Sequence, residues 1–178
     1  QYPTTLLFWD QRGLGVARLV ATEQLATDLG PTRLGPDALL ITLAELRGRL
    51  ASCRRPIKVA LLDQKLLAGV GNLYASEILH RARIHPAAEC RRLRRADWVR
   101  LHAAMGEVLE LAVSHQGSTL RDGTYRIARD TPGDFQALHR VYQRHGQLCL
   151  QCQRSEIVRV VQAQRSTFYC PRCQRARG

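Results

Sequence analysis

The stretch "LLAGVGNLYASEIL", residues 66–79, places two glycines between two apolar segments that both have helical spacing. Glycine adopts backbone conformations closed to other residues, and Gly69 and Gly71 would also let the backbone of another molecule come close. Asn72 is a favourable N-cap, and the amides that begin the next helix can bind an anion. The turn is therefore a candidate phosphate site, although a tight connection between two packed helices would need similar residues.

Helices are expected on both sides of this turn. Leucines three and four residues apart predict a helix over 37–51, and a second helix begins near Pro56 and includes the apolar stretch "VALLDQKLLA". A third is predicted from about Asn72 to Arg81, and a fourth, with one apolar stripe, over 96–115. The region around the turn should thus be helical.

The beginning of the chain has a different pattern. Residues 4–20 predict a β-hairpin, because "TTLLFW" and "GVARLV" flank a turn that ends at Gly13. Two strands alone are not stable in water, so we expect this hairpin to pair with strands upstream or to lie against the helices. The segment 22–36 contains two Gly-Pro pairs and is predicted to be a linker.

Two Cys-x-x-Cys pairs lie near the end of the chain, joined by strand-like sequence. Such pairs can bring four thiolates around one zinc ion, and a site filled by four protein ligands is structural, with no open position for catalysis. Disulfides are the alternative, but a cytosolic setting keeps thiols reduced. The predicted zinc ligands are Cys149, Cys152, Cys170 and Cys173. Cys53 and Cys90 have no partner at ligand spacing and are expected to be small buried residues.

The chain is strongly basic, with 27 Lys and Arg against 15 Asp and Glu and a formal net charge of +12. All the basic residues except Lys58 and Lys65 are arginine, whose planar guanidinium suits bidentate contact with phosphate. Residues 140–178 carry eight arginines against one acid, Glu156. A polyanion is therefore the first partner to consider, and Arg165, at the tip of the predicted zinc hairpin, could clamp a backbone phosphate. A merely solvated basic surface is the alternative.

No apolar run is long enough to predict a membrane span, and no signal peptide is evident. These absences favour a cytoplasmic protein that does not bind membranes.

Several stretches, in this order, resemble the formamidopyrimidine-DNA glycosylase and endonuclease VIII family of base-excision repair enzymes. They are "FWDQRGLG", "IKVALLDQKLLAGVGNLYASEIL", "IHP", "GSTLRD", "HRVYQR" and "CLQC" with "AQRSTFYCPRC". The resemblance implies a mainly α fold with a small β zinc-finger hairpin. The implied domains are the tail of a truncated β-sandwich catalytic domain at 1–21, the linker at 22–36, a helix-two-turn-helix DNA-binding domain at 37–140 and a zinc finger at 141–178.

The same resemblance implies a monomer that holds one structural zinc, binds double-stranded damaged DNA and works at the bacterial nucleoid. Asn72 matches the phosphate-binding asparagine of the turn that contains Gly69 and Gly71, and Arg165 matches the arginine at the finger tip. Tyr142 matches a tyrosine near the DNA backbone.

Three more residues acquire expected roles from the resemblance. Lys58 matches a helix lysine linked to lesion processing, and Arg12 matches the arginine that faces the base opposite the lesion. Leu14 stands where a phenylalanine wedge is common, so the wedge is smaller and the preference for the opposite base cannot be carried over. The loop 122–135 lacks the usual aromatic-rich pattern, so the lesion preference cannot be carried over either.

Family chemistry uses an N-terminal proline amine as nucleophile and a following glutamate as acid and base. Pro3 is not terminal, so the chain as given is expected to bind DNA without cutting it. The whole protein is expected to be a bifunctional DNA glycosylase and abasic-site lyase that acts on oxidised bases. Asp63, Glu77 and His80 are expected to cap, to form ion pairs or to be solvated, rather than to be catalytic.

Two other functions remain open from the sequence. A non-catalytic module would recognise damaged DNA without excising a base. A zinc ribbon of the transcription or translation machinery would have no phosphate site at Asn72.

Overall fold

The computed structural model describes Phe8, Asp10 and Gly13 singly, together with residues 15–30, 33–118 and 135–176. Arg12 and Leu14 lie outside these residues, and so does the predicted lesion loop except for its last residue.

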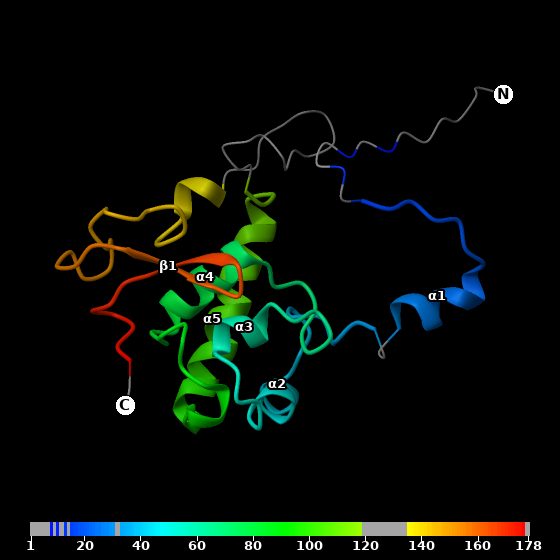
Figure 1. The fold of residues 1–178 in the computed structure, drawn as a ribbon, viewed down its shortest axis with the longest axis horizontal. Helices are drawn as coiled ribbons and strands as arrows, with labels where there is room; N and C mark the ends of the chain where they lie inside the picture. Colours follow the sequence, from blue (N-terminus) through cyan, green and yellow to red (C-terminus); the bar gives the residue numbers. More distant parts are fainter. Residues whose placement is uncertain are drawn as a thin grey trace.

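Helices α4 (Asn72–Arg81) and α5 (Arg95–Ser114) pack against each other at the centre of the structure. Helix α2 (Leu43–Leu50) packs on α5, and α3 (Ile57–Leu61) packs on α4 (Figure 1). The apolar faces of these helices form the main core, whose largest fully buried side chains are Leu46, Leu50, Ile57, Leu61, Leu67, Ile78, Leu79, Trp98, Leu101 and Met105. The predicted bounds of α4 are confirmed, and those of α5 are right to within one residue.

Helix α2 begins later than the predicted 37–51. Thr42 Oγ1 accepts a hydrogen bond from the Glu45 amide at 3.2 Å, and a Glu45 carboxylate oxygen accepts one from the Thr42 amide at 3.0 Å. This capping box satisfies the amides at a helix start, so the helix begins at Leu43. The preceding residues instead form a turn, in which Asp37 Oδ1 accepts from the Leu39 amide at 2.8 Å.

Helix α3 is much shorter than predicted. It ends at Leu61, and the Asp63 carboxylate accepts a hydrogen bond from the Lys65 amide at 3.0 Å. Aspartate competes with helix in this way because its short side chain bonds to nearby backbone amides. Only the first three residues of the apolar stretch "VALLDQKLLA" are therefore helical, and the rest is non-helical.

The predicted N-terminal hairpin is not formed in the part that the structure describes. Residues 15–20 contain no strand, although "GVARLV" was expected to be one. A strand pair needs further neighbours to be stable, and the described residues provide none there. Helix α1 (Thr22–Leu29) occupies much of the segment predicted as a linker and stands clear of the helical body in Figure 1.

The zinc-finger hairpin consists of β1 (Val158–Gln162) and β2 (Arg165–Tyr169), which pair antiparallel with Gln162 opposite Arg165. The two residues between them, Ala163 and Gln164, have φ of 45° and 60°. Positive φ at both positions is typical of the type I′ turn, whose twist matches that of a hairpin.

The hairpin has its own small core and rests on the helical body. Val141, Ile157 and Phe168 pack with two of the predicted zinc ligands, Cys149 and Cys170. Strand β2 lies against α4 (Figure 1). Two short 3₁₀ turns, η1 (Cys90–Arg92) and η2 (Phe135–Leu138), complete the described elements. Among these elements, no helix has the length and apolar character to cross a membrane.

Candidate nucleic-acid interface

The turn before α4 uses its two glycines differently. Gly69 has φ of +94°, a conformation that other residues adopt only under strain. Its amide donates to Gln64 Oε1 at 3.0 Å, while Gln64 Nε2 donates to the Val70 carbonyl at 3.0 Å. Gly71 is extended, with φ of −98° and ψ of 176°. The prediction of a special conformation is thus confirmed for Gly69 and wrong for Gly71.

What Gly71 provides is access. A Cβ atom built there would meet nothing within 4 Å, so a ligand can approach the backbone from open space. Gly71 is also the N-cap of α4, and no side chain caps this helix end. The first amides of a helix have no partner within the helix, and the helix dipole makes that end attractive to anions.

The prediction that Asn72 caps α4 is wrong, because its side chain is used elsewhere. Asn72 is the first helical residue, and its Nδ2 donates to the carbonyl of Ser166 in β2 at 3.0 Å. This hydrogen bond joins the turn to the zinc-finger hairpin. The two predicted phosphate contacts, at Asn72 and Arg165, therefore lie side by side.

Lys58 also joins the turn to the zinc-finger hairpin. Its side chain is completely buried, and Nζ donates to Asn72 Oδ1 at 2.6 Å, to Thr167 Oγ1 at 2.8 Å and to the Ser166 carbonyl at 3.3 Å. Three acceptors satisfy the three hydrogens of an ammonium group. Burial, and then repulsion by Arg165, lowers the pKa of Lys58 to about 8.

Arg165 is the exposed member of this group. It begins β2, directly before Ser166, and its side chain is open to solvent. Since the carbonyl of Ser166 accepts a hydrogen bond from Asn72, the preceding residue Arg165 lies close to the turn. A fixed positive charge and an uncapped helix N-terminus thus lie near each other, an arrangement suited to neighbouring phosphates.

Glu77, in the middle of α4, orients the segment that leads into the zinc finger. Its buried carboxylate accepts hydrogen bonds from the amides of Arg140, Val141 and Tyr142 at 2.9, 3.0 and 2.8 Å. Burial raises the pKa of Glu77, and the three amides oppose that rise. The expectation that Glu77 caps rather than catalyses is consistent with this geometry.

The half-buried ring of Tyr142 packs in an aromatic row. Its centroid lies 5.2 Å from that of Phe168 and 5.7 Å from that of His139, both in edge-on contact. The ring therefore fixes β2 relative to the 140–142 segment, and contact with DNA at Tyr142 stays a prediction.

Asp63 and His80 behave differently from each other. Asp63 forms the expected ion pair with Arg55, at 3.0 Å. His80 is neither paired with an acid nor solvated, because its side chain is buried and Nε2 lies 3.5 Å from the sulfur of Cys149. The prediction for His80 is therefore wrong: it packs beside a predicted metal ligand.

The four predicted zinc ligands converge. Their sulfur atoms all lie within 4.8 Å of one another, with 3.9 Å between Cys149 and Cys173 and 3.7 Å between Cys152 and Cys170. Sulfurs at about 2.3 Å from a tetrahedral zinc ion are about 3.8 Å apart, so the cluster fits one structural zinc.

Buried Gln174 ties this cluster to the helical body. Its Oε1 accepts from the Cys170 amide at 3.0 Å, and its Nε2 donates to the Ile84 carbonyl at 2.9 Å. Sequence reasoning missed Gln174, as it missed the acceptors Ser166 and Thr167. Alternation in β2 would put Thr167 on the same face as exposed Arg165, yet Thr167 and its neighbour Phe168 are both buried, so the sequence offers no signal for this group.

The comparisons with known proteins agree with this architecture. Residues 34–124 match the family model described as the formamidopyrimidine-DNA glycosylase H2TH domain, and residues 146–176 match the zinc finger found in FPG and IleRS. The chain belongs to the formamidopyrimidine-DNA glycosylase family. The match over 34–124 also argues against an isolated zinc ribbon of the translation machinery.

Individual members of the family are substantially similar. The formamidopyrimidine-DNA glycosylase of Chloroflexus aurantiacus is 45% identical over 172 residues, which are 95% of this chain and 60% of the relative. The MutM (Fpg) protein from Thermus thermophilus, known from a crystal structure, has 43% sequence identity to this chain. Its structure matches with a TM-score of 0.78, over 84% of this chain and 57% of that one. The Lactococcus lactis Fpg in complex with DNA containing an abasic site is 31% identical, with a TM-score of 0.80 over 88% and 57%. The chain thus spans about 60% of the length of the curated relatives it matches.

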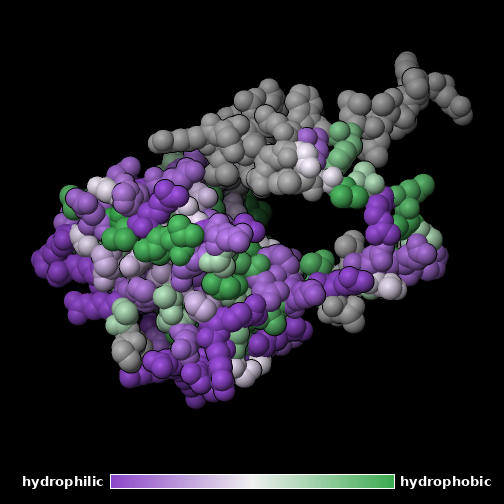
Figure 2. Space-filling view, in the orientation of Figure 1, coloured by the Kyte–Doolittle hydropathy of each residue, from purple (hydrophilic) through white to green (hydrophobic). Residues whose placement is uncertain are grey.

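One face of the helical body and zinc finger is largely hydrophilic. Figure 2 shows purple residues over most of the drawn face of the helical body and zinc finger. Basic side chains on the finger contribute to it, and its exposed arginines include Arg154, Arg159, Arg165, Arg172 and Arg175.

Proposed function

We propose that this chain is the DNA-binding part of a base-excision repair glycosylase that acts on oxidised bases. The observation that carries the proposal is the hydrogen bond from Asn72 to Ser166, because it sets the N-terminus of α4 beside Arg165. The solved complex of the Lactococcus lactis Fpg with abasic-site DNA supports damaged duplex as the partner.

The two groups would grip neighbouring phosphates of one strand. The first amides of α4 would bind one phosphate, with Gly71 leaving room for the sugar-phosphate chain, and Arg165 would bind the next. Flipping a base out of the duplex costs a few kcal/mol, which backbone contacts on both sides of the lesion can offset. As the family resemblance implies, Arg12 would face the orphaned base opposite the lesion, and Leu14 would be the wedge.

Excision is proposed for the whole protein. Lys58 is unsuited to be the nucleophile, because its amine is buried and all three of its hydrogens are engaged. Its proposed role is to hold Asn72 in place, while the N-terminal proline amine implied by the resemblance would attack the sugar and form a Schiff base.

Binding is tested by fluorescence anisotropy on a duplex that contains a tetrahydrofuran abasic-site analogue, over a range of salt concentrations. Arg165→Ala should weaken binding and reduce the salt slope by about one. Arg172→Ala, which removes the same charge from an exposed position near the metal cluster, is the matched control and should change the slope less. Equal slopes for Arg165→Ala and the unaltered chain would overturn the assignment of Arg165.

The lyase reaction is tested separately, by adding borohydride to the whole protein with abasic-site DNA. Reduction of a Schiff base should trap a covalent complex with abasic-site DNA. If the whole protein binds that DNA and no complex is trapped, the protein is a damage-binding module and the lyase proposal fails.

A further inference from the structure

Two cysteines outside the metal cluster meet in the helical body. Cys53 lies before α3 and Cys90 begins η1, and their backbones run side by side. The Cys90 amide donates to the Arg55 carbonyl at 3.1 Å, and the Arg91 amide donates to the Cys53 carbonyl at 3.1 Å. Both side chains also pack in the main core, Cys90 within it and partly buried Cys53 against it.

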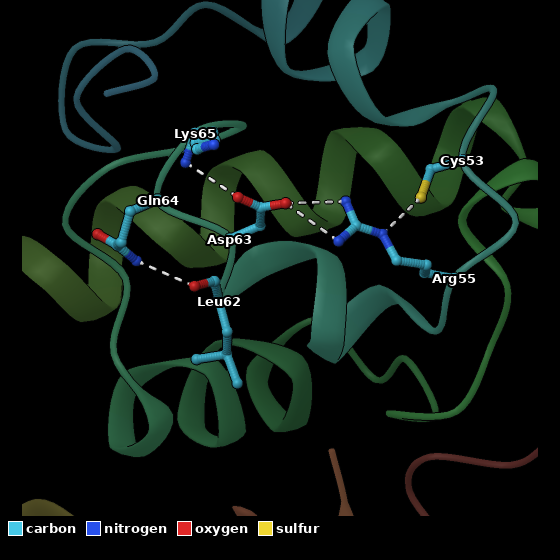
Figure 3. Close-up of polar contacts among 6 residues, drawn as sticks. All are labelled: Cys53, Arg55, Leu62, Asp63, Gln64 and Lys65. Carbon is cyan, nitrogen blue, oxygen red and sulfur yellow. Dashed lines mark hydrogen bonds and ion pairs between the residues drawn. The ribbon is translucent and has the colours of Figure 1, made fainter. Parts of the chain in front are cut away.

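Arg55 gives the two thiols different electrostatic surroundings, because its guanidinium contacts Cys53. Its Nε donates to the sulfur of Cys53 at 3.3 Å, while its two terminal nitrogens donate to one carboxylate oxygen of Asp63 at 3.0 and 3.1 Å (Figure 3). The Lys65 amide holds the other oxygen of Asp63 at 3.0 Å. A chain of contacts from Lys65 to Cys53 thus aims a guanidinium at one thiol. Burial alone would raise the pKa of Cys53, but the contacts with Arg55 lower it overall.

Cys90 has the opposite surroundings. Its side chain is completely buried, whereas that of Cys53 is only partly buried. Burial raises the pKa of Cys90 to about 12, so it remains a protonated thiol. Solvent reagents can therefore reach Cys53, whereas Cys90 is shielded from them. Cys53 is thus the thiol placed to react first, and Cys90 must lose its proton as it reacts in turn.

We propose that Cys53 is a peroxide-reactive cysteine and that Cys90 resolves it into a disulfide. The Cys53 thiolate attacks one oxygen of a hydroperoxide, forming an S–O bond as the O–O bond breaks, and the departing oxygen takes a proton to leave as water or an alcohol. Cys90 sulfur then attacks the sulfenic sulfur, forming the S–S bond as the S–O bond breaks. The hydroxyl leaves as water with the proton of Cys90. The two thiols lose two electrons in total, and the hydroperoxide gains them.

The new bond would join two segments that support α3. The Ile57 amide donates to the Ala88 carbonyl at 2.8 Å, and Pro56 pairs with Glu89. The closed loop would contain Lys58 and the turn before α4. The proposal is independent of the proposed function, because it concerns the thiols alone and applies whether or not the protein excises bases.

The test uses the zinc-loaded chain and hydrogen peroxide in small increments, followed by iodoacetamide and trypsin without reductant. The expected product is a cross-link between the tryptic peptides of residues 50–54 and 84–91, lighter by two hydrogens and reversed by dithiothreitol. A chromophoric chelator, read in parallel, should show the cross-link before any zinc is released. Zinc release that precedes oxidation of Cys53 would overturn the proposal.

Variants separate the two roles. Cys90→Ser should leave Cys53 to oxidise to a sulfinic acid, since no resolving thiol remains, and Cys53→Ser should leave Cys90 unmodified in the folded protein. Circular dichroism checks that both variants fold. Sulfinic acid at Cys53 in the unaltered chain, without a cross-link, would show that Cys90 does not resolve it.

The role of Arg55 has a matched control in its neighbour Arg54, which is exposed and carries the same charge. Arg55→Met should slow alkylation of Cys53 near neutral pH several-fold, and Arg54→Met should not. Equal rates in the two variants would mean that the guanidinium contact does not activate Cys53.

Discussion

The Nζ atom of Lys58 lies 2.6 Å from Oδ1 of Asn72, and the same amine bonds to Ser166 and Thr167 of the zinc-finger hairpin. One buried side chain of α3 therefore holds both the turn before α4 and strand β2. The position of Arg165 relative to the helix N-terminus depends on this contact, because Ser166 follows Arg165 directly.

Replacing Lys58 with Met should destabilise the protein by about 1–3 kcal/mol, since Asn72 Oδ1 and Thr167 Oγ1 would be left without their donor. Urea unfolding measures this loss. Lys65→Met is the control, because Lys65 is exposed and is the only other lysine. Equal stability of the two variants would show that the buried amine does not hold the hairpin.

The two glycines of the turn should respond differently to the same change. Gly69→Ala should destabilise the fold by about 1 kcal/mol or more, because the φ of +94° strains any side chain. Gly71→Ala should stay within about 0.5 kcal/mol of the unaltered chain, since its backbone is extended and its Cβ would meet open space. It should nevertheless weaken binding to abasic-site duplex, because the methyl group would occupy the approach to the helix N-terminus. Full affinity in Gly71→Ala would contradict the phosphate site.

His139 should make the fold sensitive to acid. Burial lowers its pKa from 6.5 to about 4, so the unfolded chain binds a proton between these two values and the folded chain does not. The free energy of unfolding should therefore fall as the pH drops through this window, by at most about 1.4 kcal/mol per pH unit for one proton. His139→Gln should therefore lose less free energy of unfolding between about pH 7 and pH 5 than the unaltered chain, as urea unfolding at the two pH values would show. Some pH dependence should remain in this variant, since the pKa of His80 is also lowered to about 4. An unchanged slope in His139→Gln would refute the prediction.

Removal of zinc should unfold the finger and spare the helices. The finger core contains two of the ligands, Cys149 and Cys170, while the main core contains none of the four. After chelation, the amides of residues 145–176 should exchange rapidly, whereas the helical circular dichroism should largely remain. Cys53→Ser should keep one zinc per chain, and Cys149→Ser should not. Concerted loss of both regions would show that the two cores fold as one.

The sequence predicted the parts of this fold that have strong local signals. Periodicity located α4 and α5, and the two Cys-x-x-Cys pairs predicted a cluster that the structure brings together. Local hydrogen bonds changed the other bounds: the capping box at Thr42 moved the start of α2, and Asp63 stopped α3.

The connections within the candidate site could not be predicted. Lys58 and Thr167 are separated by 109 residues, and nothing in either segment indicates that the two side chains meet. Asn72 has the residue type of a cap, but its tertiary partner at Ser166 decides where its side chain points. The same holds for Cys53 and Cys90, whose spacing suggested no pairing.

Helix α4 carries three residues that act on different segments: Asn72 bonds to β2, Glu77 to the amides of 140–142, and His80 contacts the zinc ligand Cys149. From Asn72 to His80 the helix rises about 12 Å and turns through about 800°. A residue inserted between them would rotate one contact by about 100° relative to the next. We therefore expect family members to vary in loop length around α4 while keeping the number of residues within it.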